Sequence, residues 1–157
     1  MIISFAGHSQ LYRSEEIKKE VKAQLQNSIS KGQKVTCYLG GYGDFDNVCA
    51  RVCRELKSDG YSIEAVYVTP YIPISDQSKI KEMIKSGLYD TALYPPLEGV
   101  LPRFAISKRN EWMMRCADLV IVYVKRTYGG AYASYVMAQR AKKRIINVYD
   151  MIGNKKR

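Results

Sequence analysis

The sequence predicts an α/β protein of the Rossmann-like type, a three-layer sandwich with a mainly parallel sheet of about five strands. Apolar runs of strand length alternate with segments whose apolar residues recur at helical spacing, as in parallel sheets covered by helices on both faces. Two glycine-rich turns, residues 39–46 and 128–132, each lie between a predicted strand and a predicted helix. Such turns bring backbone N–H groups and the positive end of a helix dipole to the carboxyl ends of strands, where α/β sheets bind phosphates.

The first strand and helix are predicted from an apolar run and a capping residue. Residues 2–6 form a short apolar run, which indicates a buried strand. Ser14 is a good N-cap residue with two acidic residues directly after it, and apolar residues then recur every four positions up to Gly32. Residues 34–39 are a second strand that leads into the first glycine turn.

The rest of the chain continues the alternation around one long interruption. Helical spacing after the first turn ends near Gly60, and five further elements are predicted: a strand at 63–68, a helix at 106–116, a strand at 119–124, a helix at 131–142 and a strand at 144–148. Residues 71–103 break the rhythm with prolines and tyrosines, and within them residues 79–86 are predicted as a short helix. A connection this long is usually functional or disordered, and its aromatic content favours an ordered, ligand-facing insert. The whole chain, residues 1–157, is predicted to be one domain.

Composition narrows the class of protein. The 157 residues, 46% of them hydrophobic, suffice for a folded core, and no apolar run approaches the ~18 residues of a membrane span or forms a signal peptide. The four cysteines form no CxxC pair and lie far in sequence from the lone His8, so we expect reduced thiols in a cytoplasmic protein, no metal and no cofactor. The net charge of +10 permits nucleic-acid binding, but the basic residues are dispersed and no recognition motif is present, so an anionic small ligand is the favoured partner.

The first glycine turn is the primary candidate site. We expect Gly40, Gly41 and Gly43 to lie against a ligand, although Asp46 stands where the dinucleotide fingerprint would have its third glycine. Asp44 and Asp46 either stabilise the N-terminus of the following helix or accept hydrogen bonds from ribose hydroxyls. A valine at Gly41 or at Gly130 of the second turn is expected to block ligand approach without unfolding the protein.

Other candidate residues follow the remaining strands. His8 is either structural or part of the ligand crevice, and the arginines are either a solvated face or ligands of a phosphate, with Arg109 preferred over Arg103. The aromatic residues of the second turn either stack on a base or cover the turn. The further candidates for ligand binding are Gly7, His8, Arg103, Arg109, Asn110, Tyr128, Gly129, Gly130, Ala131 and Tyr132.

Five segments together resemble one known group of proteins. They are residues 5–8 (FAGH), 39–46 (LGGYGDFD), 102–113 (PRFAISKRNEWM), 117–123 (ADLVIVY) and 128–131 (YGGA). This set is similar to the SLOG superfamily, the Rossmann-like group that includes YpsA-type and DprA-type proteins and the Lonely Guy phosphoribohydrolases. The resemblance extends over nearly the whole chain and is nearest to small YpsA-like proteins of Firmicutes and their phages.

The resemblance implies binding more than catalysis. Lonely Guy enzymes carry a PGGxGTxxE motif with a catalytic glutamate; here Asp44 replaces the threonine and Asn47 stands in the place of the glutamate. An asparagine cannot act as a general acid or base. The resemblance therefore implies a homo-oligomeric, non-catalytic sensor or sponge for an ADP-ribose-like or cyclic nucleotide signal in bacterial or phage immunity. The alternative is an N-glycosidic-bond hydrolase or transferase that uses Asp46 or His8; a DNA-associated role ranks third.

Overall fold

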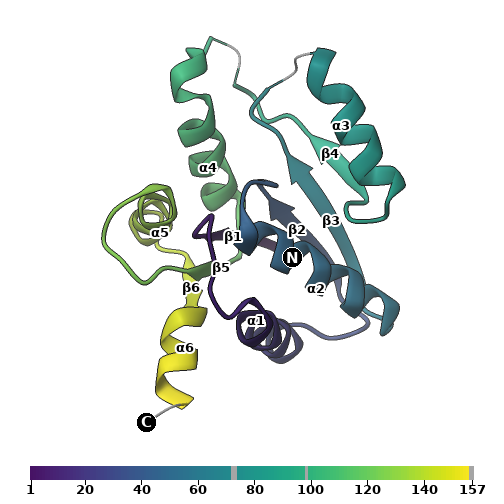
Figure 1. Ribbon diagram of the computed structural model, residues 1–157, viewed down its shortest axis with the longest axis vertical. Coiled ribbons are helices and arrows are strands. Elements are labelled where there is room, and N and C mark those ends of the chain that lie inside the picture. Colours follow the sequence, from purple (N-terminus) through teal and green to yellow (C-terminus); the bar gives the residue numbers. More distant parts are fainter. Residues whose placement is uncertain (72–73, 98, 156–157) are drawn as a thin grey trace.

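The computed structural model describes residues 1–71, 74–97 and 99–155 (Figure 1). Its strands are β1 (Ile2–Gly7), β2 (Lys34–Leu39), β3 (Ser62–Val68), β4 (Thr91–Leu93), β5 (Leu119–Tyr123) and β6 (Arg144–Asn147). Its helices are α1 (Ser14–Ser28), α2 (Asp44–Ser58), α3 (Ile74–Lys85), the 3-10 turn η1 (Pro102–Phe104), α4 (Ala105–Cys116), α5 (Gly130–Arg140) and α6 (Val148–Lys155).

The strands form one parallel sheet in the order β4-β3-β2-β1-β5-β6, which confirms the predicted Rossmann-like α/β fold. The central strand β1 pairs with β2 on one side, where Ile3 lies opposite Cys37, and with β5 on the other, where Ser4 lies opposite Val120. From β1 the chain builds outward to β4 and then returns to β5. The space beyond the carboxyl end of β1 is therefore a topological switch point, where open α/β sheets bind ligands.

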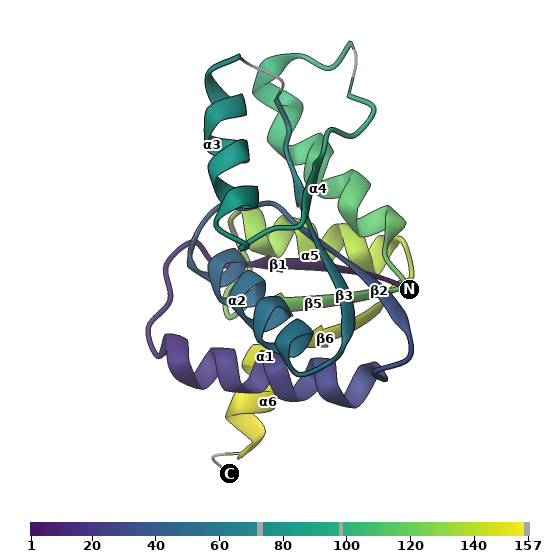
Figure 2. The same ribbon diagram turned by 90° about the vertical axis from the view of Figure 1, so that its right-hand side faces the viewer.

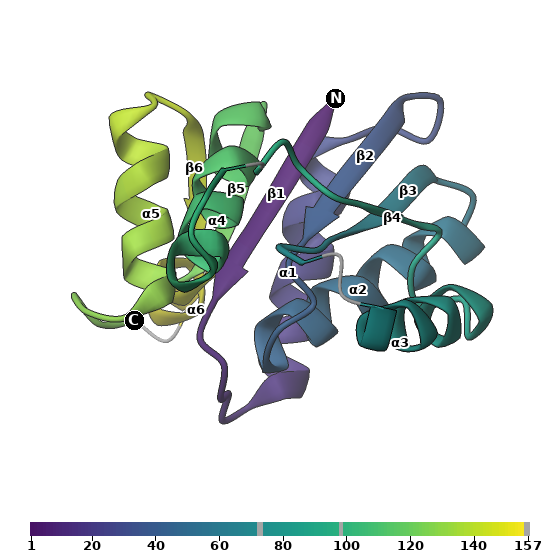
Figure 3. The same ribbon diagram turned by 90° about the horizontal axis from the view of Figure 1, so that it is seen from above.

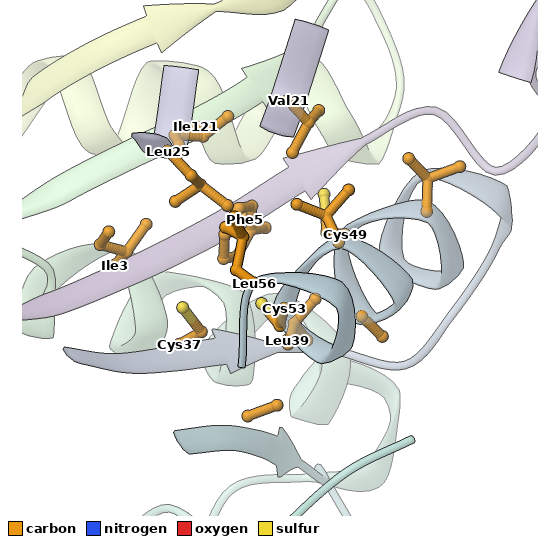
Figure 4. Packing of buried hydrophobic residues seen from close by; sticks show 14 of the residues in the cluster. Ile3, Phe5, Val21, Leu25, Cys37, Leu39, Cys49, Cys53, Leu56 and Ile121 are labelled. Carbon is orange, nitrogen blue, oxygen red and sulfur yellow. The ribbon is translucent and has the colours of Figure 1, made fainter. Parts of the chain in front are cut away.

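Helices cover both faces of the sheet. Helices α1, α2 and α6 pack on one face and α4 and α5 on the other, as Figures 2 and 3 show. Figure 4 shows the larger core, in which Phe5 of β1 meets apolar side chains of α1 and α2. Three of the cysteines, Cys37, Cys49 and Cys53, are buried in this core as free thiols.

The structure adds two regular elements, β4 and α6, and the 3-10 turn η1 to those predicted, and it extends α3. Strand β4 has only three residues, too few for a periodic pattern, and it pairs beside β3 as a sixth strand inside the predicted insert. Helix α3 begins at Ile74 rather than near residue 79, and α6 follows β6 without a turn residue that would mark its start. Residues 72, 73 and 98 of the insert lie outside the described residues. No helix in the described ranges is long and apolar enough to cross a membrane.

Candidate functional site

A cavity of about 250 Å³ opens at the carboxyl edge of the sheet, beside the end of β1. Its walls come from the end of β1, both glycine turns, helix α4 and the start of α5. The first turn contributes Gly40 and the second contributes Gly130, and these turns follow the strands on either side of β1. The structure thus brings the two turns to one cavity.

Eight of the predicted site residues line this cavity: Gly7, His8, Gly40, Asp46, Arg109, Asn110, Gly130 and Ala131. Seven do not: Gly41, Gly43, Asp44, Arg103, Tyr128, Gly129 and Tyr132. Among these seven, Arg103 stacks on the exposed ring of Phe104 at 4.8 Å, so it lies on an exposed surface and not against the cavity.

The glycines of the first turn are required by packing. A Cβ on Gly41, where φ is +66°, would lie 2.0 Å from Cε2 of Tyr67, and one on Gly43 would lie 2.6 Å from Cα of Ser9. The expectation that a valine at Gly41 leaves the fold intact is therefore wrong, because the side chain would meet both a ring and an unfavourable backbone conformation. At Gly130 no heavy atom lies within 4 Å of the added Cβ, so the expectation stands there.

The two helix N-termini at the cavity are alike in geometry and different in charge. The N-cap glycines of α2 and α5, Gly43 and Gly129, have φ values of 95° and 91°, and neither offers a side-chain cap. Helix α2 has Asp44 and Asp46 in its first turn, whereas α5 has no acid there. Asp44 is further engaged, since its Oδ2 accepts a hydrogen bond from the Leu11 N–H at 2.9 Å. The positive end of the α5 dipole is consequently the one left for an anion in the cavity.

Asp46 is a buried carboxylate on the cavity wall. Its Oδ2 accepts a hydrogen bond from the Tyr42 N–H at 3.0 Å, and its side chain has no other hydrogen bond to the described part of the chain. Burial raises the pKa of Asp46 to about 6, although the Tyr42 N–H and the charge of Arg109 oppose that shift. An acceptor oxygen therefore remains for a donor in the cavity, such as a ligand hydroxyl.

Arg109 is largely committed to the fold. It is 4% exposed; its Nη1 donates to the carbonyl oxygens of Val68 at 2.8 Å and Gly40 at 3.1 Å, and its Nε donates to Oδ1 of Asn110 at 2.8 Å. These bonds tie helix α4 to the ends of β2 and β3. Only Nη2 has no partner among the described residues, so this single nitrogen is available to a ligand.

His8 is held as a neutral donor. Its Nε2 accepts a hydrogen bond from the Lys125 N–H at 3.1 Å, which assigns the ring proton to Nδ1. Burial, together with the charges of Arg126 and Lys125, lowers the pKa of His8, which favours the neutral ring. The edge-on contact with Tyr123, 5.8 Å between ring centres, fixes its orientation.

Sequence reasoning missed four polar residues of the cavity, Ser9, Tyr42, Arg126 and Ser134. Ser134 is 3% exposed, and its hydroxyl makes no hydrogen bond to the described chain. It follows Gly130 by four residues, so helical spacing alone could have placed it on the same face of α5. Arg126 is exposed at the cavity mouth and stacks on Tyr128 at 5.0 Å. The position of Arg126 between β5 and the second glycine turn could have indicated that it lies near the cavity.

The polar groups left for a ligand are mostly donors. They include the N–H groups at the start of α5, Nδ1 of His8, Nη2 of Arg109, the Ser134 hydroxyl and the Arg126 guanidinium, and among the described residues of the cavity wall Asp46 is the one carboxylate. Such a set suits an anion that also carries a hydroxyl. Within the described ranges, no group of three or more His, Cys, Asp or Glu residues could hold a metal ion.

The fold and cavity define a Rossmann-like protein with a cavity at its switch point. No model of a known protein family matches the chain, and no curated protein matches its sequence. Among solved structures it is similar to DNA processing protein A (DprA) from Streptococcus pneumoniae, with a TM-score of 0.60 and 14% identity, covering 91% of this chain and 48% of that one. It is also similar to DprA from Helicobacter pylori, described with a single-stranded DNA binding mode, with a TM-score of 0.61 and 13% identity over 99% and 73% of the two chains. The chain thus spans about half the length of the Streptococcus protein, and the likeness is one of fold.

Proposed function

We propose that the protein binds a nucleotide-derived anion, ADP-ribose-like or cyclic, without turning it over, and acts as a sensor or a sequestering sponge. The observation that carries this proposal is the convergence of uncommitted donors around one buried acceptor, Asp46. Phosphate and ribose together supply the complementary groups: anionic oxygens for the donors and a hydroxyl proton for the carboxylate.

In this proposal, the phosphate group of the ligand binds at the second glycine turn. The first turn of α5 has no acid and opens on the cavity at Gly130, whereas α2 already has two acids at its N-terminus. Arg126 adds an exposed positive charge at the cavity mouth. The ribose then lies toward the first turn, where Asp46 can accept from a hydroxyl.

The cavity volume limits how much of the ligand is enclosed. About 250 Å³ is below the ~300–1,000 Å³ of most small-molecule pockets, so a sugar phosphate fits inside while the rest of a larger nucleotide extends outward. A binder that leaves part of its ligand at the surface is consistent with either sensing or sequestration.

We further propose that the protein is a homo-oligomer and that it acts in the bacterial cytoplasm. Light scattering after size exclusion measures its molar mass and so tests the oligomeric state.

Calorimetry tests the binding. Inorganic phosphate, ribose 5-phosphate, ADP-ribose, cyclic ADP-ribose isomers and a short single-stranded oligonucleotide are titrated into the protein, and small molecules released on heating are identified by mass spectrometry. We expect binding of at least one sugar phosphate and its recovery intact. Binding of the oligonucleotide alone would contradict the proposal and favour a DNA-associated role.

The second candidate is hydrolysis or transfer at an N-glycosidic bond, and the raised pKa of Asp46 favours it. A buried carboxyl that titrates near pH 6 in a cavity is typical of a general acid or base. Against it, the Nε2 lone pair of His8 is occupied by the Lys125 N–H, which leaves no second carboxylate or imidazole base among the described residues that line the cavity. Release of free base from nucleotides over many turnovers, abolished by Asp46→Asn, would make the enzyme the correct assignment.

A further inference from the structure

A second, smaller pocket lies in the Pro/Tyr-rich insert, outside the cavity described above. It has a volume of about 230 Å³, and its lining residues are aromatic, aliphatic or proline, with no charged side chain among them. Two tyrosines, Tyr71 after β3 and Tyr94 after β4, face it together with Val100 and Ala105. In Figures 1 and 2 the segments after β3 and β4 come together above the sheet, near the start of α4.

Local hydrogen bonds hold the walls of this pocket in place. The Thr69 N–H donates to the Leu93 carbonyl at 2.9 Å, which joins the ends of β3 and β4. The Thr69 hydroxyl donates to the Tyr71 carbonyl at 3.0 Å and accepts from the Tyr71 N–H at 3.3 Å. On the other wall, the Val100 N–H donates to the Leu97 carbonyl at 3.0 Å. The pocket is thus formed by bonded backbone before any ligand enters.

The pocket adjoins the cavity through helix α4. Ala105 lines the pocket, the next residue, Ile106, lines the cavity, and Arg109 lies one helical turn further along, a rise of ~5.4 Å. Neighbouring residues of α4 therefore line the two spaces.

We propose that this pocket binds the planar base of the nucleotide ligand, with the rings of Tyr71 and Tyr94 as its aromatic contacts. The inference rests on the proposed function and adds a second subsite to it. Sugar and phosphate groups lose their hydration at a cost in an uncharged, apolar space, whereas a flat heterocycle gains stacking and apolar contact there. The two spaces divide the ligand between them, with the charged part beside α5 and the base in the insert.

The test compares nucleotides with the same sugar phosphate that lacks a base. Each of the four nucleoside 5′-monophosphates and ribose 5-phosphate are titrated into the wild type, Val100→Phe, Tyr94→Ala and Leu101→Phe. Val100→Phe fills the pocket, Tyr94→Ala removes one aromatic wall, and Leu101→Phe is the matched control, because Leu101 is 53% exposed and does not line the pocket. Thermal unfolding of each variant confirms that it is folded before titration.

We expect the wild type to bind at least one monophosphate about tenfold or more tightly than ribose 5-phosphate. Val100→Phe and Tyr94→Ala should bind the monophosphate no more tightly than ribose 5-phosphate, and their affinity for ribose 5-phosphate should stay within about twofold of the wild-type value. Leu101→Phe should keep the preference for the monophosphate. Ribose 5-phosphate binding with no gain from any base, or a gain that survives Val100→Phe, would overturn this inference and leave the proposed function standing. Binding of none of these compounds would overturn both.

Discussion

The guanidinium group of Arg109 lies directly against the backbone of Gly40. Its Nη1 donates to the Gly40 carbonyl at 3.1 Å, and a Cβ on Gly40 would lie 3.0 Å from Cζ of the arginine. This contact joins helix α4 to the first glycine turn across 69 residues of sequence. The absence of a side chain at Gly40 therefore allows the buried charge to approach, and the shape of the cavity depends on that approach.

Gly40→Ala should lower the free energy of unfolding by about 1–3 kcal/mol, because the methyl group must displace a guanidinium fixed by three hydrogen bonds. Chemical denaturation measures the change. Gly32→Ala is the matched control, since no heavy atom lies within 4 Å of its added Cβ. Equal stability of the two variants would show that Arg109 moves aside without cost.

Gly130→Val should leave the protein folded and abolish binding of sugar phosphates. The added side chain meets no atom of the described chain within 4 Å of its Cβ, yet Gly130 lines the cavity at the N-terminus of α5. Calorimetry with ribose 5-phosphate measures the loss, and Gly32→Val serves as the control. Full affinity in Gly130→Val would place the ligand anion away from this helix.

Arg126→Ala should weaken binding of ribose 5-phosphate roughly three- to tenfold and reduce its dependence on salt. The side chain is exposed at the cavity mouth, where solvent screens its charge, so a larger effect is not expected. Arg51→Ala removes the same charge from a groove between α1 and α2 and should leave the affinity unchanged. Equal losses in the two variants would indicate only a general effect of net charge.

The raised pKa of Asp46 predicts a specific pH dependence of stability. With a pKa of about 6 in the folded state against 3.8 ordinarily, the folded protein binds this proton more tightly than the unfolded chain. The contribution of this proton to the free energy of unfolding is fully present below about pH 4 and is lost as the pH rises through 6. The change amounts to up to ~3 kcal/mol. The difference in unfolding free energy between the wild type and Asp46→Asn should therefore fall from pH 4 to pH 7. A constant difference would show that Asp46 titrates normally.

Tyr89→Phe should stabilise the protein or leave it unchanged. The side chain is 1% exposed, and its hydroxyl oxygen is buried without a hydrogen-bond partner in the part of the chain that the structure describes. Removal of an unsatisfied buried hydroxyl relieves a desolvation cost of ~1–3 kcal/mol while the ring packing remains. Denaturant unfolding measures the effect. A marked loss of stability would mean that the hydroxyl has a partner in solution.

The alternation of strands and helices and the place of both glycine turns could be read from the sequence, because these signals are local. Apolar periodicity reflects which face of an element is buried, and Gly43 and Gly129 mark helix N-termini that need positive φ. Strand β4 could not be found in this way, because three residues carry no period and only pairing with β3 makes them a strand.

The sequence by itself determined the fold class and the edge of the sheet at which the candidate site lies. Only the tertiary structure decided the use of each residue there: Arg109 binds the carbonyls of Gly40 and Val68, His8 accepts from Lys125, and Ser134 faces the cavity. The physical reason is that a side chain's partners are set by which distant segments the folded chain brings beside it. Periodicity and turn residues report only the next few positions along the chain, and so they indicate where a polar group lies without indicating what it binds.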